Sequence, residues 1–127
     1  MLIDLDNFKS INDTLGHVAG DQCLAEAGRR LVQTVPPNTM VARIGGDEFA
    51  ILVDASSPVG AEDLSSRILE AFAHPFLFKS ETRSIGLSLG IAHRTNEDGE
   101  ALYHNADLAL YKAKSSGRGA WRVYNAA

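Results

Sequence analysis

Two short apolar runs, separated by a glycine pair and two acids, constrain the fold of this chain more than any other feature. The runs cover residues 40–44 and 49–53, and Gly45-Gly46-Asp47-Glu48 lies between them. Glycine adopts the positive φ values that tight hairpin turns require, so this pattern predicts a β-hairpin. The chain is therefore expected to contain at least one antiparallel pair of strands.

Apolar residues at helical spacing predict three helices outside this hairpin. Each is expected to begin or end at a capping or helix-breaking residue. The three are a helix capped by Asp21 and ended by Pro36-Pro37, a helix capped by Ser57 with Pro58 at its first position, and a helix over residues 101–114.

Three further apolar stretches predict strands over residues 2–5, 84–92 and 121–124. Residues 6–20 are rich in Asn, Asp, Gly and Ser, so a loop is expected there, and a turn is expected at residues 96–99. The resulting order, β-α-β-β-α-β-α-β, indicates an α+β fold in which helices cover a mixed or antiparallel sheet. Because no repeat or linker interrupts this order, residues 1–127 are expected to form a single domain.

The charge and cysteine content of the chain argue against several functions. A net charge of −4 and a pI near 5.5 disfavour nonspecific binding to nucleic acid or to an anionic membrane, because both need a basic surface. No stretch is long and apolar enough for a transmembrane helix. Cys23 is the single cysteine, so no internal disulfide can form, and a buried helix position in a reducing cytoplasm is expected for it.

Asp4 would lie at the end of a buried strand, where a carboxylate is costly unless a partner compensates its charge. Magnesium is a natural partner, because it prefers oxygen ligands and takes few of them from protein. The alternative is that Asp4 or Asp6 caps the following turn, which is the commoner role for an aspartate in this position.

Asp47 and Glu48 are two adjacent acids at the tip of the predicted hairpin. They repel each other and stabilise nothing locally, although a tip that faces solvent would tolerate them. If the hairpin lies beside the strand at residues 2–5, Asp47 and Asp4 come together. Acids that converge from neighbouring strands are the arrangement used for two-metal phosphoryl chemistry.

Three motifs follow one another along nearly the whole chain. They read Asp4-x-Asp6-x-Phe8-Lys9-x-x-Asn12-Asp13-x-x-Gly16-His17-x-x-Gly20-Asp21, then Arg43-x-Gly45-Gly46-Asp47-Glu48-Phe49, then Ser88-x-Gly90-Ile91-Ala92 with Ala106-Asp107-x-Ala109-Leu110-Tyr111-x-Ala113-Lys114-x-x-Gly117-Arg118. Together they resemble the GGDEF family of diguanylate cyclases, which join two GTP molecules into cyclic di-GMP. The resemblance implies a ferredoxin-like, palm-type sheet with helices packed around it, as in nucleotidyl cyclase catalytic domains.

The resemblance also implies a metal site and a catalytic pair among these acids. The implied metal ligands are the Asp4 carboxylate, the backbone carbonyl of Leu5 and the Asp47 carboxylate, which would hold two Mg or Mn ions per GTP site. Asp47 and Glu48 would be catalytic, and Glu48 would help with the metals or with deprotonation of the attacking hydroxyl.

Other positions match the parts of the family site that contact the nucleotide. Asn12 and Asp21 match the positions that read guanine, and a carboxylate can accept two hydrogen bonds from an edge that adenine lacks. Phe8 and Lys9 match the turn whose backbone amides hold the phosphates, and Lys114 and Arg118 match the cations that hold the terminal phosphates. Gly45 and Gly46 are further substrate-binding positions that the resemblance implies. Without the resemblance, Asp21 would be interpreted as a helix cap, and Lys114 and Arg118 as exposed cations.

The chain departs from the family pattern in two places. Pro36 and Thr39 stand where family members carry an inhibitory product-binding Arg-x-x-Asp motif, so we expect no product inhibition through that site. Family domains also begin earlier, with a further helix and the first part of the first strand. We therefore expect an amino-terminally truncated domain with an exposed apolar sheet face.

The implied activity is a cyclase that binds GTP and works as a homodimer of two facing half-sites. Sensory or phosphodiesterase domains are the expected neighbours in a parent protein, either in the cytoplasm or as the cytoplasmic part of a membrane-anchored chain. Contact with nucleic acid or directly with a membrane is not expected. Two alternatives stay open: a GTP-binding regulatory module with weak or no catalysis, and an inactive truncated fragment.

Overall fold

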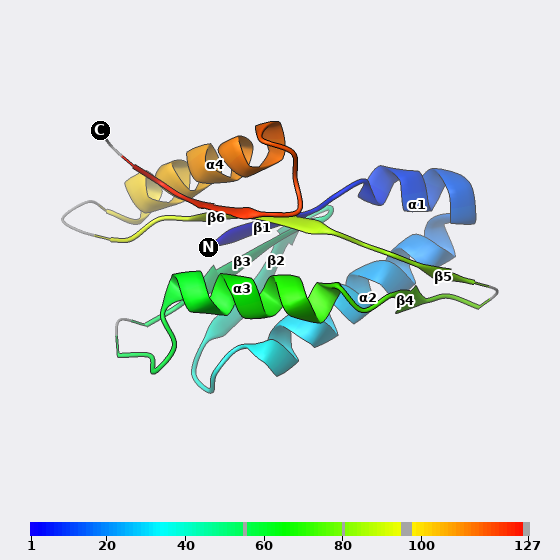
Figure 1. Cartoon of the computed structure of the whole chain (residues 1–127), viewed down its shortest axis with the longest axis horizontal. Coiled ribbons are helices and arrows are strands. Elements are labelled where there is room, and N and C mark those ends of the chain that lie inside the picture. Colours follow the sequence, from blue (N-terminus) through cyan, green and yellow to red (C-terminus); the bar gives the residue numbers. More distant parts are fainter. Residues whose placement is uncertain (55, 80, 95–97, 126–127) are drawn as a thin grey trace.

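The computed structural model describes residues 1–54, 56–79, 81–94 and 98–125. Within these residues, a mixed five-stranded sheet runs in the order β2-β3-β1-β6-β7, with helices on both faces (Figure 1). Its strands are β1 (Leu2–Leu5), β2 (Met40–Gly45), β3 (Glu48–Leu52), β6 (Leu87–Ile91) and β7 (Trp121–Val123). Neighbouring strands are antiparallel except β6 and β7, which are parallel. The α+β prediction is confirmed.

Helices enclose the sheet from two sides (Figure 1). α2 and α3 cover one face, α4 covers the other, and α1 packs on α2 beside the carboxyl end of β1. Their bounds are Phe8–Leu15 for α1, His17–Thr34 for α2, Ala61–Phe72 for α3 and Gly99–Ser115 for α4.

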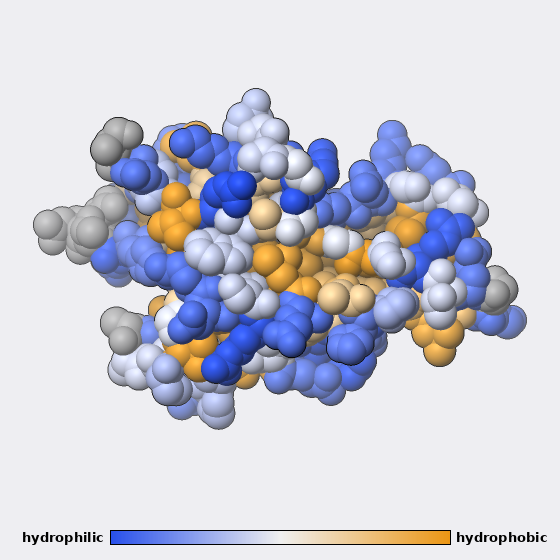
Figure 2. Space-filling model, in the orientation of Figure 1, coloured by the Kyte–Doolittle hydropathy of each residue, from blue (hydrophilic) through white to orange (hydrophobic). Residues whose placement is uncertain are grey.

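Side chains of β1 alternate between two apolar clusters, because successive residues of a strand point to opposite faces. Ile3 belongs to the larger cluster, which α2 and α3 close, and Leu2 belongs to a smaller one with Ala106 and Leu110 of α4. Figure 2 shows the apolar surface along the middle of the molecule, at the level of the sheet, flanked by hydrophilic surface on the helices. The main core therefore lies between the sheet and the α2–α3 layer.

Helix α4 lies directly on β6 because of one glycine. A Cβ at Gly90 would lie 2.3 Å from the carbonyl oxygen of Ala106 and 2.3 Å from the amide nitrogen of Leu110. Only glycine permits such a close approach of two backbones. This contact sets the height of α4 above the sheet and so places the end of α4 near the end of β1.

The predicted hairpin is confirmed by β2 and β3. Met40 pairs with Leu52 and Arg43 pairs with Phe49, and the register shifts between Arg43 and Gly45. Gly46 has a φ of 41°, a left-handed conformation that favours glycine. The shift and the turn together carry Asp47 and Glu48 to the end of the sheet.

The expected loop at residues 6–20 is wrong, since this segment forms α1 and the first turn of α2. Ile11 of α1 is buried, and α1 packs along α2, so tertiary packing outweighs the low helix propensity of its Asn, Asp and Ser residues. Asn7 and Gly16, both at positive φ, set the two ends of α1. The polar composition of this segment conceals the helix, because its apolar position Ile11 is buried only by tertiary packing.

Two predicted caps are also wrong. Asp21 lies inside α2, which begins at His17, and Ser57 lies before α3, which begins after Gly60. The Ser57 hydroxyl donates to the Val59 carbonyl oxygen at 2.9 Å and accepts from the Val59 amide at 3.2 Å, so it stabilises a turn. Such local bonds compete with capping. The predicted end of the first helix is confirmed, because α2 stops at Thr34.

The strand expected over residues 84–92 is shorter in the structure, where β6 covers Leu87–Ile91. A separate antiparallel pair, β4 (Phe76–Leu77) and β5 (Thr82–Arg83), precedes it and was not predicted. Of the turn expected at residues 96–99, residues 96 and 97 lie outside the described residues. The remaining part starts α4, with the Asp98 side chain accepting from the Ala101 amide at 2.9 Å.

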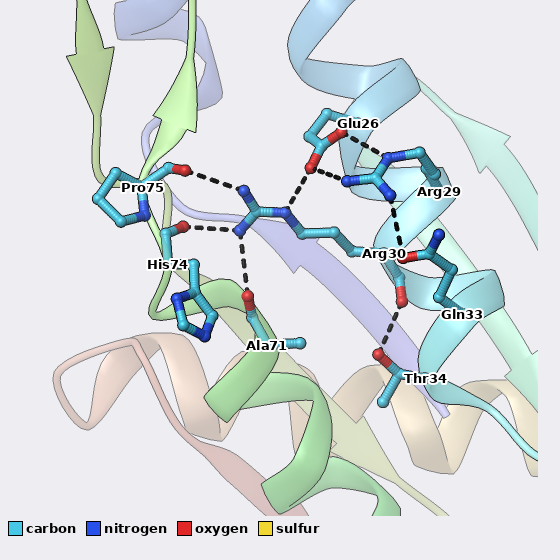
Figure 3. Close-up of polar contacts among 8 residues, drawn as sticks. All are labelled: Glu26, Arg29, Arg30, Gln33, Thr34, Ala71, His74 and Pro75. Atoms are coloured by element: carbon cyan, nitrogen blue, oxygen red, sulfur yellow. Dashed lines mark hydrogen bonds and ion pairs between the residues drawn. The ribbon is translucent and has the colours of Figure 1, made fainter.

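Arg30 joins α2 to the end of α3 (Figure 3). Its guanidinium lies over the Phe76 ring, 3.9 Å from the centroid, and its side chain is only 11% exposed. It donates hydrogen bonds to the Glu26 carboxylate at 2.7 Å and to the carbonyl oxygens of Ala71 (3.1 Å), His74 (2.6 Å) and Pro75 (3.0 Å). The Ala71 carbonyl lies in the last turn of α3 and the other two follow it, where intrahelical donors run out.

Candidate functional site

The acids of β1 and of the hairpin meet at one end of the sheet. β1 pairs with β3 so that Asp4 lies opposite Glu48, and the Leu5 amide donates to the Asp47 carbonyl oxygen at 3.1 Å. The hairpin therefore lies beside β1. This was the condition under which Asp4 and Asp47 were expected to come together. These acids are 43 or more positions apart in the sequence, and strand pairing alone brings them together.

Asp4 is the buried member of this group. Its side chain is 13% exposed, and its Oδ1 atom is buried with no hydrogen-bond partner among the described residues. Its other oxygen, Oδ2, forms an ion pair with the Lys114 ammonium. A buried carboxylate oxygen without a donor is costly, so this position fits a cation or a donor that the protein does not supply.

Asp47 and Glu48, the acids next to Asp4, both have raised pKa values. Burial is the largest cause that raises the pKa of Asp47, and the Asp4 carboxylate raises it further. Burial and the Asp4 charge likewise raise the pKa of Glu48. Both carboxylates are therefore held in a place that disfavours their ionised forms, as acids at functional sites often are.

The ligands available here fit magnesium better than they fit a metal whose ligands all come from protein side chains. Among the described residues, no group of three His, Cys, Asp or Glu side chains is arranged to hold an ion. Asp4, Asp47 and a backbone carbonyl would leave several coordination positions for water and phosphate oxygens. Magnesium is usually bound in this way, through one or two carboxylates plus substrate phosphates.

Tyr103 of α4 also reaches this group, and nothing in the sequence indicated it. Its hydroxyl donates to Glu48 Oε1 at 3.4 Å, across 55 positions of sequence. The side chain is exposed, and the Glu48 charge is the first cause that raises its pKa. Tyr103 thus connects α4 to one oxygen of Glu48.

The two residues expected to read guanine lie at the contact between α1 and α2. A Cβ on Gly20 would lie 1.8 Å from Asn12 Oδ1, so the Asn12 carboxamide rests directly on the backbone next to Asp21. Asp21 is exposed on α2, where its carboxylate is available to a ligand. A side chain at position 20 would therefore collide with Asn12, so the contact between α1 and α2 requires glycine there.

Phe8 and Lys9 form the first turn of α1. The N-cap residue, Asn7, makes no side-chain hydrogen bond to this turn. Backbone amides at the start of a helix lack intrahelical acceptors and carry partial positive charge, which favours a phosphate. The structure therefore agrees with a phosphate-facing turn at Phe8 and Lys9, whose roles stay predictions.

Lys114 and Arg118 lie at the end of α4 and in the loop that follows it. Lys114 pairs with Asp4, and Arg118 Nη1 lies 3.7 Å from Asp6 Oδ1. They are therefore not solitary surface cations, because Lys114 pairs with an acid of β1 and Arg118 approaches the acid that follows it. The structure gathers the predicted metal ligands and the predicted phosphate-binding cations at one end of the sheet.

Asp6 has a structural role that sequence reasoning missed. Its side chain is buried and accepts hydrogen bonds from the Ser88 hydroxyl at 2.9 Å and from the Gly119 amide at 3.0 Å. The suggestion that Asp6 caps the next turn is wrong, since Asn7 is the N-cap residue of α1. A polar Ser88 inside an otherwise apolar strand was the available signal.

The hairpin tip beside the acids is held by one arginine. Arg43 Nε donates to the Gly46 carbonyl oxygen at 2.9 Å. A Cβ added to Gly45 or Gly46 would meet no atom within 4 Å, so the tip is open to a ligand. The predicted contact of these glycines with substrate remains a prediction.

Pro36 and Thr39 lie in the turn between α2 and β2. The Thr39 amide approaches the Pro36 carbonyl oxygen at 3.3 Å. Neither side chain can supply the guanidinium or carboxylate of the Arg-x-x-Asp pattern. The expected absence of product inhibition through these positions stays a prediction.

None of the helices in the described ranges combines the length and apolar character that a membrane span requires.

Residues 1–120 match the family described as "Diguanylate cyclase, GGDEF domain". Among curated relatives, diguanylate cyclase DgcP of Pseudomonas aeruginosa is 44% identical over 119 residues, which are 92% of this chain and 18% of DgcP. Cyclic di-GMP phosphodiesterase PdeR of Escherichia coli is 38% identical over 126 residues, which are 96% of this chain and 19% of PdeR. The chain thus spans less than a fifth of the length of either relative.

Solved structures agree with these relatives. The crystal structure of the GGDEF domain of PA1120 (YfiN or TpbB) from Pseudomonas aeruginosa superposes with a TM-score of 0.91 at 38% identity. The match covers 99% of this chain and 81% of that one. Both the fold and the order of its elements are therefore shared.

Proposed function

This chain belongs to the GGDEF family of diguanylate cyclase domains, and on that premise we propose that it condenses two GTP molecules into cyclic di-GMP with release of pyrophosphate. The observation that carries the proposal is the buried Asp4 oxygen without a partner beside Asp47. Such an arrangement is unfavourable unless the site receives positive charge during its work. A nucleotide triphosphate with divalent cations would bring that charge.

In the proposed reaction, the 3′-hydroxyl oxygen of one GTP attacks the α-phosphorus of another. The new oxygen–phosphorus bond forms as the bond from the α-phosphorus to the bridging oxygen breaks, and pyrophosphate leaves. Bound Mg or Mn ions would lower the pKa of the hydroxyl and neutralise charge on the transferring phosphate. Asp4, Asp47 and the Leu5 carbonyl would hold them.

Glu48 is the proposed acceptor of the hydroxyl proton. Burial and the Asp4 charge raise its pKa, which makes its carboxylate a better base than an exposed glutamate. Tyr103 donates to one of its oxygens at 3.4 Å and leaves the other available for the proton. Asp47, whose pKa is also raised, is proposed to stay with the metal ions.

The proposed orientation of GTP places guanine at α1–α2 and the phosphates at the end of the sheet. Asn12 and Asp21 would accept and donate hydrogen bonds on the guanine edge. The first turn of α1 and the cations Lys114 and Arg118 would hold the phosphates. Because each chain would bind one GTP, two copies facing each other are needed for both bonds of the product.

A second candidate is a GTP-binding module that regulates an attached phosphodiesterase. The observation that favours it is that PdeR, a relative named as a phosphodiesterase, matches 96% of this chain. In that case the site would bind GTP but form no product. The complete set of acids, with both Asp47 and Glu48 present, favours the cyclase.

The test is to incubate the purified chain with GTP and Mg²⁺ and to identify products by mass spectrometry. We expect cyclic di-GMP and pyrophosphate from GTP, no corresponding product from ATP, and no product from Asp47→Ala. Stoichiometric GTP binding without product would support the second candidate. A folded dimer that neither binds nor converts GTP would be an inactive fragment and would refute both proposals.

A further inference from the structure

The side chain of Asp6 connects three parts of the chain at the end of the sheet. It starts in the segment after β1, accepts from the Ser88 hydroxyl of β6 at 2.9 Å, and accepts from the Gly119 amide of the loop before β7 at 3.0 Å. The Asp6 amide donates to the Gly86 carbonyl oxygen at 2.9 Å, which fixes its own backbone. Only 9% of Asp6 is exposed, so its side chain connects these three segments inside the protein.

The loop that Asp6 holds has an unusual backbone. Gly117, Arg118 and Gly119 have φ values of 116°, 63° and 58°, so three consecutive residues are left-handed. Arg118 is not a glycine, and a side chain in this conformation carries strain. Such a backbone persists only where surrounding contacts determine it. The contacts present are the Asp6 bond to Gly119 and a bond from the Arg118 amide to the Ala113 carbonyl oxygen at 3.0 Å.

The same carboxylate faces the arginine that this loop presents. Asp6 Oδ1 lies 3.7 Å from Arg118 Nη1, while 49% of the Arg118 side chain remains exposed. Arg118 therefore lies close to Asp6 and stays accessible to a ligand. Lys114, one helical turn earlier, points to Asp4 at the same end of the sheet.

We propose that Asp6 is a positioning residue that holds the 116–119 loop so that Arg118 meets the terminal phosphates of GTP. It would not touch the nucleotide or the reacting atoms. This inference rests on the proposed function, in which Arg118 and Lys114 bind those phosphates. Its consequence is selective: loss of Asp6 should weaken binding of the triphosphate and leave binding of the nucleoside monophosphate nearly unchanged.

Asp6→Asn is the variant that separates this role from bulk packing. The amide has almost the same volume, but it keeps one acceptor oxygen where the carboxylate has two, and it has no charge for Arg118. If its oxygen accepts from Gly119, the Ser88 hydroxyl must turn to accept from the new NH₂ group, and the uncharged oxygen is a weaker acceptor than the carboxylate. Ser88→Ala is the second variant, because it removes one donor and leaves the Asp6 charge in place. Asp63→Asn, on the exposed face of α3, is the matched control.

The experiment measures binding of GMP and of an α,β-methylene analogue of GTP, which cannot release pyrophosphate, by nuclear magnetic resonance titration of the full chain. We expect Asp6→Asn to weaken binding of the analogue about tenfold, and Ser88→Ala about threefold, with GMP changed by less than about twofold. Hydrogen exchange of the Gly119 amide should accelerate in Asp6→Asn. Asp63→Asn should match the unchanged chain in every measurement.

Equal losses for the analogue and for GMP would show a merely structural role and overturn the inference, as would a Gly119 amide that exchanges no faster in Asp6→Asn. If the unchanged chain binds the analogue, these results leave the proposed function intact. If the unchanged chain binds neither nucleotide, the proposed function fails and this inference fails with it.

Discussion

The Lys114 ammonium is paired with the Asp4 carboxylate, although the two residues are 110 positions apart in the sequence. The pair joins the last turn of α4 to the end of β1. It neutralises one oxygen of Asp4 and leaves the other, Oδ1, buried without a partner among the described residues. Lys114 therefore pairs with the carboxylate that we propose as a ligand of a divalent cation.

Replacing Lys114 should change metal and nucleotide binding in opposite directions. In Lys114→Met, loss of the competing positive charge should tighten Mn²⁺ binding without nucleotide by several-fold, because like charges repel at short range. Binding of the α,β-methylene GTP analogue should weaken roughly tenfold, since a phosphate contact is lost. Calorimetric titration measures both.

Lys112→Met is the control for that change, because Lys112 is exposed on the same helix. It should leave both affinities close to those of the unchanged chain. Weaker Mn²⁺ binding in Lys114→Met would contradict the view that Lys114 and a cation compete for Asp4.

Replacing Asp47 should separate activity from stability. Burial and the Asp4 charge raise the pKa of Asp47 in the folded state, so the folded chain loses stability as pH rises through the unfolded pKa toward the folded one. At neutral pH, Asp47→Asn removes this penalty and should raise the free energy of unfolding by less than about 1 kcal/mol, because Asp47 is only partly buried and solvent screens its charge. Product formation from GTP should fall by about 100-fold or more.

Urea unfolding without metal or nucleotide measures the stability of Asp47→Asn, and mass spectrometry measures its product. Asp63→Asn, remote from the site, should change neither quantity appreciably. An Asp47→Asn chain that is less stable at neutral pH would show that the carboxylate is already compensated inside the protein.

Asp21 should determine the choice of base without supporting the fold. It is exposed inside α2 and is not the helix cap, so Asp21→Ala should change the free energy of unfolding by less than about 0.5 kcal/mol. The preference for GTP over ATP should drop by roughly 10- to 1,000-fold, because the guanine edge loses its acceptor. Competition binding with both nucleotides measures the ratio. An unchanged ratio would place the base elsewhere.

Arg30 should be a major determinant of stability away from the site. Arg30→Met leaves the carbonyl oxygens of Ala71, His74 and Pro75 without their donor and the Glu26 carboxylate without one of its partners. We expect the free energy of unfolding to fall by about 3 kcal/mol. Arg29→Met, on the exposed side of the same helix, should lower it by less than about 1 kcal/mol. Similar losses in both variants would refute this role.

Glu26 should contribute to the acid sensitivity of the fold. Hydrogen bonds from Arg29 and then Arg30 lower its pKa from 4.5 to about 2. A lowered pKa contributes stability that is present above the unfolded pKa and is lost as pH falls toward 2. The difference in unfolding free energy between the unchanged chain and Glu26→Gln should therefore shrink from pH 6 to pH 2.

Urea unfolding at several pH values measures that difference, with Glu70→Gln on the exposed side of α3 as the control. A difference that stays constant from pH 6 to pH 2 would mean that the Glu26 charge does not contribute to stability.

Several features were predictable from the sequence because they depend on local chemistry. Glycines at the hairpin turn, the stop before Pro36 and the buried positions Leu64, Ile68 and Phe72 are determined by φ preferences and by apolar spacing. The three motifs were sufficient to identify the family, which the comparisons confirm. The convergence of Asp4 and Asp47 was also predictable, given that the hairpin pairs with β1.

Structure that depends on packing between distant segments could not be predicted from composition. Residues 8–15 form a helix because Ile11 is buried and α1 packs on α2, against the polar character of the segment. Ser57 makes a turn and Asp21 lies inside a helix, because α2 begins four residues before Asp21 and α3 begins four residues after Ser57.

By itself, the sequence determined the kinds of residue at the site, the hairpin that carries two of the acids, and the family. The tertiary structure alone decided that Lys114 meets Asp4, that Tyr103 meets Glu48 and that Asp6 supports the 116–119 loop. The reason is that each of these contacts spans 55 or more positions of sequence and exists only because α4 lies on β6 through Gly90. Local preferences can place an acid at the end of a strand, but only the packing of whole elements decides which charge it faces.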